Sequence, residues 1–275
     1  MEPSNSISVL ENVLLHGSAR DDDPAVPTLI LVHGSMDRRG AWARIVRRLG
    51  PTWRVITYDR RGYARSVDSP GPFDVDHNVA DLVAIIERHS KFPVVIAGHS
   101  FGGVVALTTV ARRPDLVRSV AVYEPPQSWN AWWPGNTGGA MAVARADQPA
   151  DAAEAFMRRV VGDATWERLP ERTRAARRAE GRALVGELSD IRRVAPFDPT
   201  RIGRPVLVGR GERASNHQVR GADELSRAVG TAPVVLAGAG HNAHTSHAAE
   251  FAELLIEPLR TERDRTGDPS GWKSS

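Results

Sequence analysis

The sequence of 275 residues contains no cysteine. This absence excludes a disulfide framework, thiolate metal ligands and a cysteine nucleophile, so any chemistry must use oxygen or nitrogen groups. No apolar run approaches the roughly 20 residues of a membrane span. The first residues, MEPSNSISVLENVLLHG, also lack the apolar core of a signal peptide. We therefore expect a cytoplasmic protein with no membrane partner.

An excess of charge of one sign is also missing, because 36 basic residues face 33 acidic ones. A net charge of +3 does not suggest a nucleic-acid partner. We expect a small-molecule partner and neither a metal ion nor a cofactor. All but two of the basic residues are arginine.

Short β-rich runs alternate with helical stretches along the chain. They are almost continuously apolar, which is typical of a parallel sheet covered on both faces. The sequence thus predicts an α/β fold with a doubly wound, mostly parallel sheet. An antiparallel edge hairpin of residues 7–10 and 13–16 is a further expectation. The predicted core strands are Thr28 to Val32, Val55 to Tyr58, Val94 to Ala97, Val117 to Tyr123, Val206 to Val208 and Val234 to Leu236.

Strands and helices do not alternate in residues 126–203, because this segment shows helical patterns and no convincing strand. Asp151 and Glu154 are spaced as a capping pair, and Arg172 to Ile191 is rich in helix formers. We expect a helical cap at 126–203 inserted into an α/β core of 1–125 and 204–260, and a disordered tail at 261–275. The arginines of the cap could attract an anionic substrate or form a solvated helix face, and the second interpretation is favoured.

One serine lies among glycines where a predicted strand meets a predicted helix, in VVIAGHSFGGVVALTTV. A sharp strand-to-helix turn crowds the backbone, and Gly98 and Gly102 relieve the crowding on either side of Ser100. Such a turn exposes a serine hydroxyl above the carboxyl edge of the sheet. A phosphate-binding loop is the competing interpretation, but no Lys-Ser or Lys-Thr pair follows the glycines.

Together with LVHGSM (31–36), YDRRGYARS (58–66) and GAGHNAH (238–244), this turn resembles the α/β-hydrolase superfamily from about Ser8 to Leu259. The resemblance implies a serine nucleophile, a histidine base and a carboxylate. His241 follows the last predicted strand, where the superfamily places its base. His244 and His247 lie nearby and either line the site or cap the last helix, and His99 is expected to be structural.

The position of the acid departs from the common pattern of the superfamily. Its usual aspartate corresponds to Ala214, which cannot orient a histidine. Glu124 ends the strand after the serine helix, and Pro125 and Pro126 stop the strand there. One subgroup of haloalkane dehalogenases and the zearalenone lactone hydrolases are similar in placing a glutamate at this point. We favour Glu124 as the acid, with Glu212 and the absence of a working acid as alternatives.

The oxyanion hole that the resemblance implies consists of backbone N–H groups. It maps onto Phe101 and Ser35, with Gly34 and Met36 as neighbours that would contact substrate. Three tryptophans follow the candidate acid in QSWNAWW, and Trp129 is the candidate for an apolar wall against substrate. Ordinary packing of Trp129 is equally favoured, and packing is favoured for Trp132 and Trp133.

These residues predict attack of Ser100 on a carbonyl, an acyl-enzyme, and hydrolysis by water that His241 activates. The expected activity is hydrolysis of a carboxylic ester or lactone with a bulky apolar or aromatic substrate. A serine at this position excludes the alkyl-enzyme chemistry of dehalogenases and epoxide hydrolases. The alternatives are a carbon–carbon bond hydrolase of the same fold and a catalytically silent protein that binds a small molecule.

Overall fold

The computed structural model describes residues 7–17 and 26–260. At its centre is a seven-stranded sheet in the order β1-β3-β2-β4-β5-β6-β7. Only β1 is antiparallel to its neighbour, so the predicted doubly wound, mostly parallel sheet is confirmed. The strands are β1 Val13–His16, β2 Thr28–Val32, β3 Arg54–Tyr58, β4 Val94–His99, β5 Val117–Tyr123, β6 Val206–Gly211 and β7 Val234–Leu236. The predicted tail at 261–275 lies outside the described residues.

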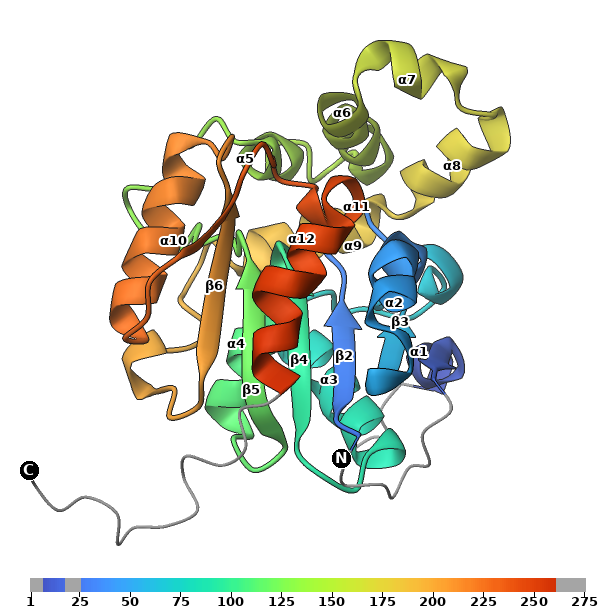
Figure 1. Ribbon diagram of the computed structural model, residues 1–275. Coiled ribbons are helices and arrows are strands. Elements are labelled where there is room, and N and C mark those ends of the chain that lie inside the picture. The colour runs from blue at the N-terminus through green and yellow to red at the C-terminus, as the bar shows by residue number, and fades with distance from the viewer. Residues whose placement is uncertain (1–6, 18–25, 261–275) are drawn as a thin grey trace, which may run out of the picture.

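The central strands are apolar throughout because helices cover both faces of the sheet. In β2, Ile30 and Val32 join the core under α3 (Val75–His89) and α4 (Phe101–Arg112). Leu29 and Leu31 join the core under α2 (Ala43–Leu49) and α12 (Ala248–Phe251). Figure 1 looks onto this second face, with α2 and α12 in front of the sheet. Alternate side chains of one strand are thus buried on opposite faces.

Outside residues 138–190, the remaining elements are short, except for α10 between β6 and β7. No helix in the described part of the chain is long and apolar enough to cross a membrane. These elements are α1 Ile7–Glu11, α10 Asn216–Ala228, α11 Ala243–Ser246, a π turn at Ala252–Ile256, and 3₁₀ turns at Arg39–Trp42, Gly50–Thr52, Ala64–Ser66, Pro199–Arg201 and Glu257–Arg260.

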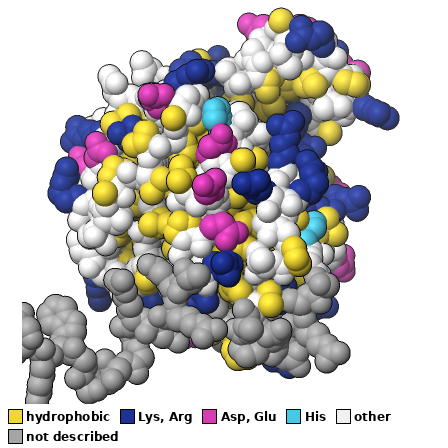
Figure 2. Space-filling view, in the orientation of Figure 1, with side chains coloured by type: hydrophobic (Ala, Val, Ile, Leu, Met, Phe, Trp, Pro, Cys, Tyr) yellow, Lys and Arg dark blue, Asp and Glu magenta, His cyan; other side chains and the backbone are white. Residues whose placement is uncertain are grey.

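Five helices separate β5 from β6 in the chain. Figure 1 shows α5 to α8 beyond the carboxyl ends of β2 and β5, toward which the arrowheads of those strands point. In the space-filling view, α6 to α8 form a lobe that stands out from the body and carries charged side chains on its outer surface (Figure 2). The five helices are α5 Gly138–Val143, α6 Pro149–Val161, α7 Asp163–Arg168, α8 Glu171–Ala179 and α9 Gly181–Asp190.

The predicted edge hairpin is wrong in its first half. Residues 7–10 lie in α1, and only β1 joins the sheet, antiparallel to β3. The single turn of α1 packs against α3 and buries Val9 completely. The side chain of Asn12, between α1 and β1, donates to the carbonyl of Arg65 instead of forming a hairpin turn.

The predicted capping pair is also wrong, because α6 begins at Pro149. Proline suits the first position of a helix, since its fixed φ matches the helix and it lacks an N–H that would go unpaired. Asp151 instead forms an ion pair with Arg178, 2.7 Å away. The helical stretch predicted at 172–191 is interrupted at Glu180, which is buried and accepts a hydrogen bond from the backbone N–H of Ala64.

Candidate active site

The turn at Ser100 is as sharp as its sequence predicts. β4 ends at His99, α4 begins at Phe101, and Ser100 between them has φ 52° and ψ −124°. Non-glycine residues rarely adopt positive φ, and such strain concentrates at functional sites. A Cβ at Gly98 would collide with the carbonyl of Gly102, so the turn requires a bare backbone on both sides of the serine.

Backbone strain recurs along the same edge of the sheet. Among the described residues, four non-glycine residues have positive φ: Met36, Ala64, Ser100 and Glu124. Three of them follow the carboxyl ends of β2, β4 and β5, three neighbouring strands. The fold therefore concentrates strained backbone where side chains of neighbouring strand ends meet.

Glu124 lies against His241, which is 117 positions away in the chain. Its Oε2 is 2.6 Å from His241 Nδ1, and its Oε1 accepts the backbone N–H of Gly211 at 2.8 Å. The glutamate side chain is fully buried, whereas the imidazole is partly exposed. Both residues line a cavity that Ser100 also lines. The structure therefore brings Ser100, Glu124 and His241 together.

Glu212, the alternative acid, has a different partner. Its side chain is exposed and accepts the backbone N–H of Gly238 at 2.7 Å. No hydrogen bond or ion pair links it to a histidine within the described residues. The geometry thus gives His241 a carboxylate partner from β5 and none from β6.

Gln218 on α10 is a neighbour of His241 that sequence reasoning missed. Its Nε2 lies 2.9 Å from the same Nδ1 that faces Glu124. Its Oε1 accepts from the backbone N–H and hydroxyl of Ser215, which fixes the orientation of the amide. A charge-assisted hydrogen bond to a carboxylate is about twice as strong as a neutral one. Nδ1–H therefore donates to Glu124, and Nε2 of His241 has a free lone pair.

His99 supports His241 from the other side. Its Nε2 donates to the backbone carbonyl of His241 at 2.9 Å, and the two rings are 4.8 Å apart. Burial, followed by the nearby His244 and His241, lowers the pKa of His99 well below its usual value. This histidine therefore stays neutral and holds the loop that carries His241, as expected for a structural residue.

Asp37, His99 and His244 form the group within the described residues that is best suited to a metal ion. Their potential ligand atoms lie within 4.8 Å of one another. His244 Nε2 already bonds Asp37 Oδ2 at 2.9 Å, and the His99 and His244 rings stack 4.0 Å apart. These contacts join the loop after β2 to the loop that carries His241. The absence of a metal ion remains a prediction.

The loop after β2 places backbone N–H groups beside the serine. A Cβ at Gly34 would lie 3.0 Å from Ser100 Cβ, so the two backbones are in close approach. The N–H groups of Ser35 and Phe101 donate no hydrogen bond to other described residues. The Ser35 hydroxyl donates to Glu187 on α9 at 2.5 Å. Unpaired donors on the loop after β2 and at the start of α4 are the arrangement that stabilises a developing negative charge.

Glu187 is a second residue that sequence reasoning missed. It is buried and pairs with Arg60 at 2.8 Å, and it also accepts from the Tyr63 hydroxyl at 2.6 Å. Burial, followed by the Glu187 charge, raises the pKa of Tyr63 well above its usual value. This buried ion pair fixes α9 to the loops after β2 and β3.

Two cavities adjoin Ser100, with volumes of about 200 and 340 Å³. Met36 lines the smaller one, and Trp133 lines the larger. Trp129 lines neither, because its ring packs edge-on against Phe197 at 5.7 Å. A cavity of about 510 Å³ lies elsewhere, between β1 and α8, and none of the three residues Ser100, Glu124 and His241 lines it. Both cavities at the serine share Ser35, Ser100, Phe156, Val160 and His241.

The fold and this arrangement define a class: a doubly wound α/β protein with serine, histidine and glutamate side chains at the carboxyl edge of its sheet. The model of the Alpha/beta hydrolase family matches residues 29–254. The chain belongs to this family. Curated relatives that it matches are named as a lipase and a methyl ester esterase.

Two curated relatives and one solved structure illustrate the similarity. Lipase LipV of Mycobacterium tuberculosis is 35% identical over 37% of this chain and 39% of its own length. A pimeloyl-[acyl-carrier protein] methyl ester esterase of Neisseria meningitidis is 28% identical over 90% of this chain and 80% of its own. An enol-lactonase from Burkholderia xenovorans superposes with a TM-score of 0.67 at 22% identity, covering 90% of this chain and 96% of that one. The last comparison concerns the fold alone.

Proposed function

We propose that the protein is a serine hydrolase that cleaves a carboxylic ester or lactone through an acyl-enzyme. The observation that carries this proposal is the 2.6 Å contact between Glu124 and His241 beside the strained Ser100. A serine hydroxyl needs a base to become nucleophilic, and the base needs a carboxylate to fix its tautomer. The contact supplies this carboxylate.

In this mechanism His241 Nε2 accepts the proton of the Ser100 hydroxyl as the oxygen attacks the substrate carbonyl. The Ser100 hydroxyl makes no hydrogen bond with the described residues. In this mechanism, its hydrogen bond to His241 Nε2 forms when substrate binds. The N–H groups of Ser35 and Phe101 stabilise the oxyanion, and His241 then protonates the departing alcohol. Water activated by the same imidazole hydrolyses the acyl-enzyme, and no step requires a metal ion or cofactor.

The linings of the cavities support a substrate with a bulky apolar part. Phe156, Met157 and Val160 line the smaller cavity, and Leu188 and Ile191 line the larger one. Most of these residues come from α6 and α9, which supports a cap at 126–203 over a core of 1–125 and 204–260. The esterase name of the Neisseria relative supports an ester more than a carbon–carbon bond.

Hydrolysis of a panel of 4-nitrophenyl esters and aryl lactones tests the proposal. We expect turnover by the wild type and a loss of at least about 10⁴-fold in kcat for Ser100→Ala. Circular dichroism and thermal unfolding verify that this variant is folded. Turnover by folded Ser100→Ala at the wild-type rate would contradict the acyl-enzyme mechanism.

A further inference from the structure

Two arginines on the larger cavity have no carboxylate partner. Arg192 donates to two neutral acceptors, the carbonyl of Leu188 at 2.9 Å and the hydroxyl of Thr137 at 3.3 Å. The side chain of Arg159 forms no hydrogen bond or ion pair with the described residues. Both side chains line the cavity that contains Ser100. Burial lowers the pKa of Arg192, as expected for a guanidinium that lacks a counter-ion.

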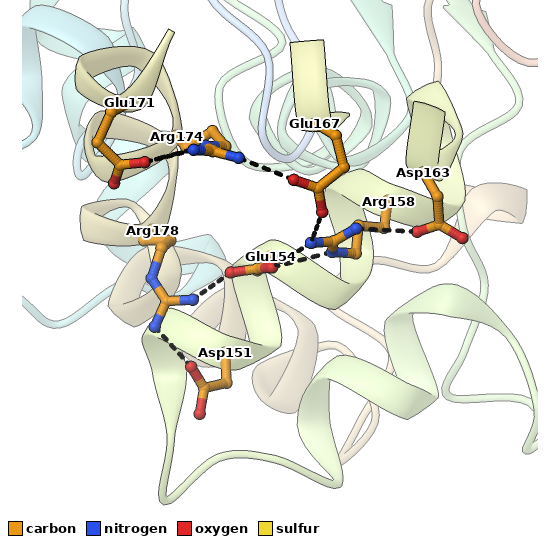
Figure 3. Close-up of polar contacts among 8 residues, drawn as sticks. All are labelled: Asp151, Glu154, Arg158, Asp163, Glu167, Glu171, Arg174 and Arg178. Carbon is orange, nitrogen blue, oxygen red and sulfur yellow. Dashed lines mark hydrogen bonds and ion pairs between the residues drawn. The ribbon is translucent and has the colours of Figure 1, made fainter. Parts of the chain in front are cut away.

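Their lack of acidic partners contrasts with three arginines on α6 and α8. Figure 3 shows Arg158, the residue before Arg159, contacting three carboxylates, and it shows Arg174 and Arg178 contacting two each. These three arginines are thus paired with acids, whereas the cavity-facing Arg159 is not. The acids are Asp151, Glu154, Asp163, Glu167 and Glu171.

The charges around the larger cavity leave a positive excess. Glu124 is the one carboxylate among its described lining residues, and it already bonds His241 and Gly211. Burial, followed by the His241 charge, lowers the pKa of His217, which also lines the cavity, so its imidazole is neutral at pH 7. Two guanidinium groups thus face a space in which every acid is already engaged.

The smaller cavity has no such excess. Its arginine, Arg177, pairs with Glu180 at 3.1 Å and donates to the carbonyl of Met36 at 2.9 Å. Its aspartate, Asp37, bonds His244. The two cavities that meet at Ser100 therefore differ in charge.

From these contacts we infer that the substrate of the proposed hydrolase carries a carboxylate, bound by Arg159 and Arg192 in the larger cavity. An uncharged part occupies the smaller cavity, and the scissile carbonyl lies between them at Ser100. A carboxylate would supply the missing counter-ion, and the planar guanidinium groups suit its two oxygens. This inference rests on the proposed function and names the substrate class of the same site.

Two matched pairs of esters test the inference. Mono-4-nitrophenyl glutarate carries its carboxylate on the acyl side, whereas 4-acetoxybenzoate carries it on the alcohol side. The methyl ester of each compound is its uncharged counterpart. For at least one pair, we expect the wild type to prefer the free acid in kcat/KM. The combined Arg159→Gln and Arg192→Gln variant should reduce the acid-to-methyl-ester ratio about ten- to a hundred-fold, because hydrogen bonds to charged groups are involved.

Arg193→Gln is the matched control, because Arg193 pairs with Asp190 outside the cavity. This variant should leave the ratio at its wild-type value. Arg192→Lys retains the positive charge, so it should retain more of the preference than Arg192→Gln. An unchanged ratio for both pairs in the folded double variant would overturn the inference.

A binding measurement separates this inference from the proposed reaction. Glutarate should bind the Ser100→Ala protein in calorimetry, more weakly at high salt, and binding should fall at least tenfold when both arginines are also replaced. If no ester is hydrolysed but glutarate binds in this way, the proposed function fails and the carboxylate site stands. Equal affinity with and without the two arginines would refute the carboxylate site, whatever the esterase activity.

Discussion

Replacing Glu124 by glutamine tests the contact on which the mechanism depends. The introduced amide is nearly isosteric, and its oxygen can still accept the N–H of Gly211 as the carboxylate does at 2.8 Å. Its NH₂ group would then face His241 Nδ1 and donate to it. The imidazole proton would move to Nε2, so His241 could no longer accept the proton of Ser100.

The size of the effect follows from this change of tautomer. In Ser-His-Asp enzymes the wrong tautomer costs about 10⁴-fold in kcat. At about 1.4 kcal/mol per factor of ten, this corresponds to roughly 5.5 kcal/mol of activation free energy. We expect a loss of this order for Glu124→Gln, because the carboxylate is fully buried and faces the imidazole directly.

The assay is steady-state hydrolysis of a 4-nitrophenyl ester, with thermal unfolding of each variant as a check on the fold. Glu212→Gln is the matched control, since Glu212 is exposed and accepts only the N–H of Gly238. Its kcat should stay within about threefold of the wild type. The reasoning is refuted if Glu124→Gln keeps kcat within tenfold of the wild type, or if Glu212→Gln loses more activity than Glu124→Gln.

Three further predictions concern stability and are checked by denaturant unfolding. Gly102→Ala places a Cβ against the carbonyl of Val32, and a loss of about 2–4 kcal/mol in unfolding free energy is expected; an unchanged midpoint would contradict the close approach. Glu187→Ala leaves the buried Arg60 without its counter-ion and should cost about 3–5 kcal/mol, whereas a cost below 1 kcal/mol would show that the ion pair is unimportant. Burial, followed by the Arg60 charge, lowers the pKa of His33 from 6.5 to about 3. Between these two pH values, His33 is protonated in the unfolded chain and neutral in the folded chain. Stability should therefore fall with pH from 6.5 toward 3, by about 1.4 kcal/mol per pH unit from this group, and the dependence should be shallower in His33→Gln.

The sheet could be predicted from local pattern because its strands are buried on both faces. The bounds of β2 match the predicted strand at Thr28 to Val32, and the turn at Ser100 follows from its glycines. The edges were harder to predict. The apolar residues at 7–10 have no periodicity that separates a strand from a single helical turn, and the packing of Val9 against the core decides the outcome.

Some residues of the candidate site could likewise be predicted from local sequence, and others could not. Ser100 and His241 lie at strand ends with recognisable motifs, and Glu124 follows from the end of its own strand. Two contacts depend on how the helices pack and follow from no local motif. They are the contact of Gln218 with His241 and that of Glu187 with Ser35. The unpaired state of Arg159 is equally invisible in sequence, because Arg158 beside it has the same chemistry and three acidic partners.

A fluorophosphonate probe, followed by peptide mass spectrometry, tests most directly whether the serine at the turn is an activated nucleophile. The account predicts covalent modification of the folded wild type on the peptide that contains Ser100. It also predicts much slower modification of His241→Ala and none of Ser100→Ala. Folded wild-type protein that stays unmodified, or that reacts equally well after Ser100→Ala, would contradict the account.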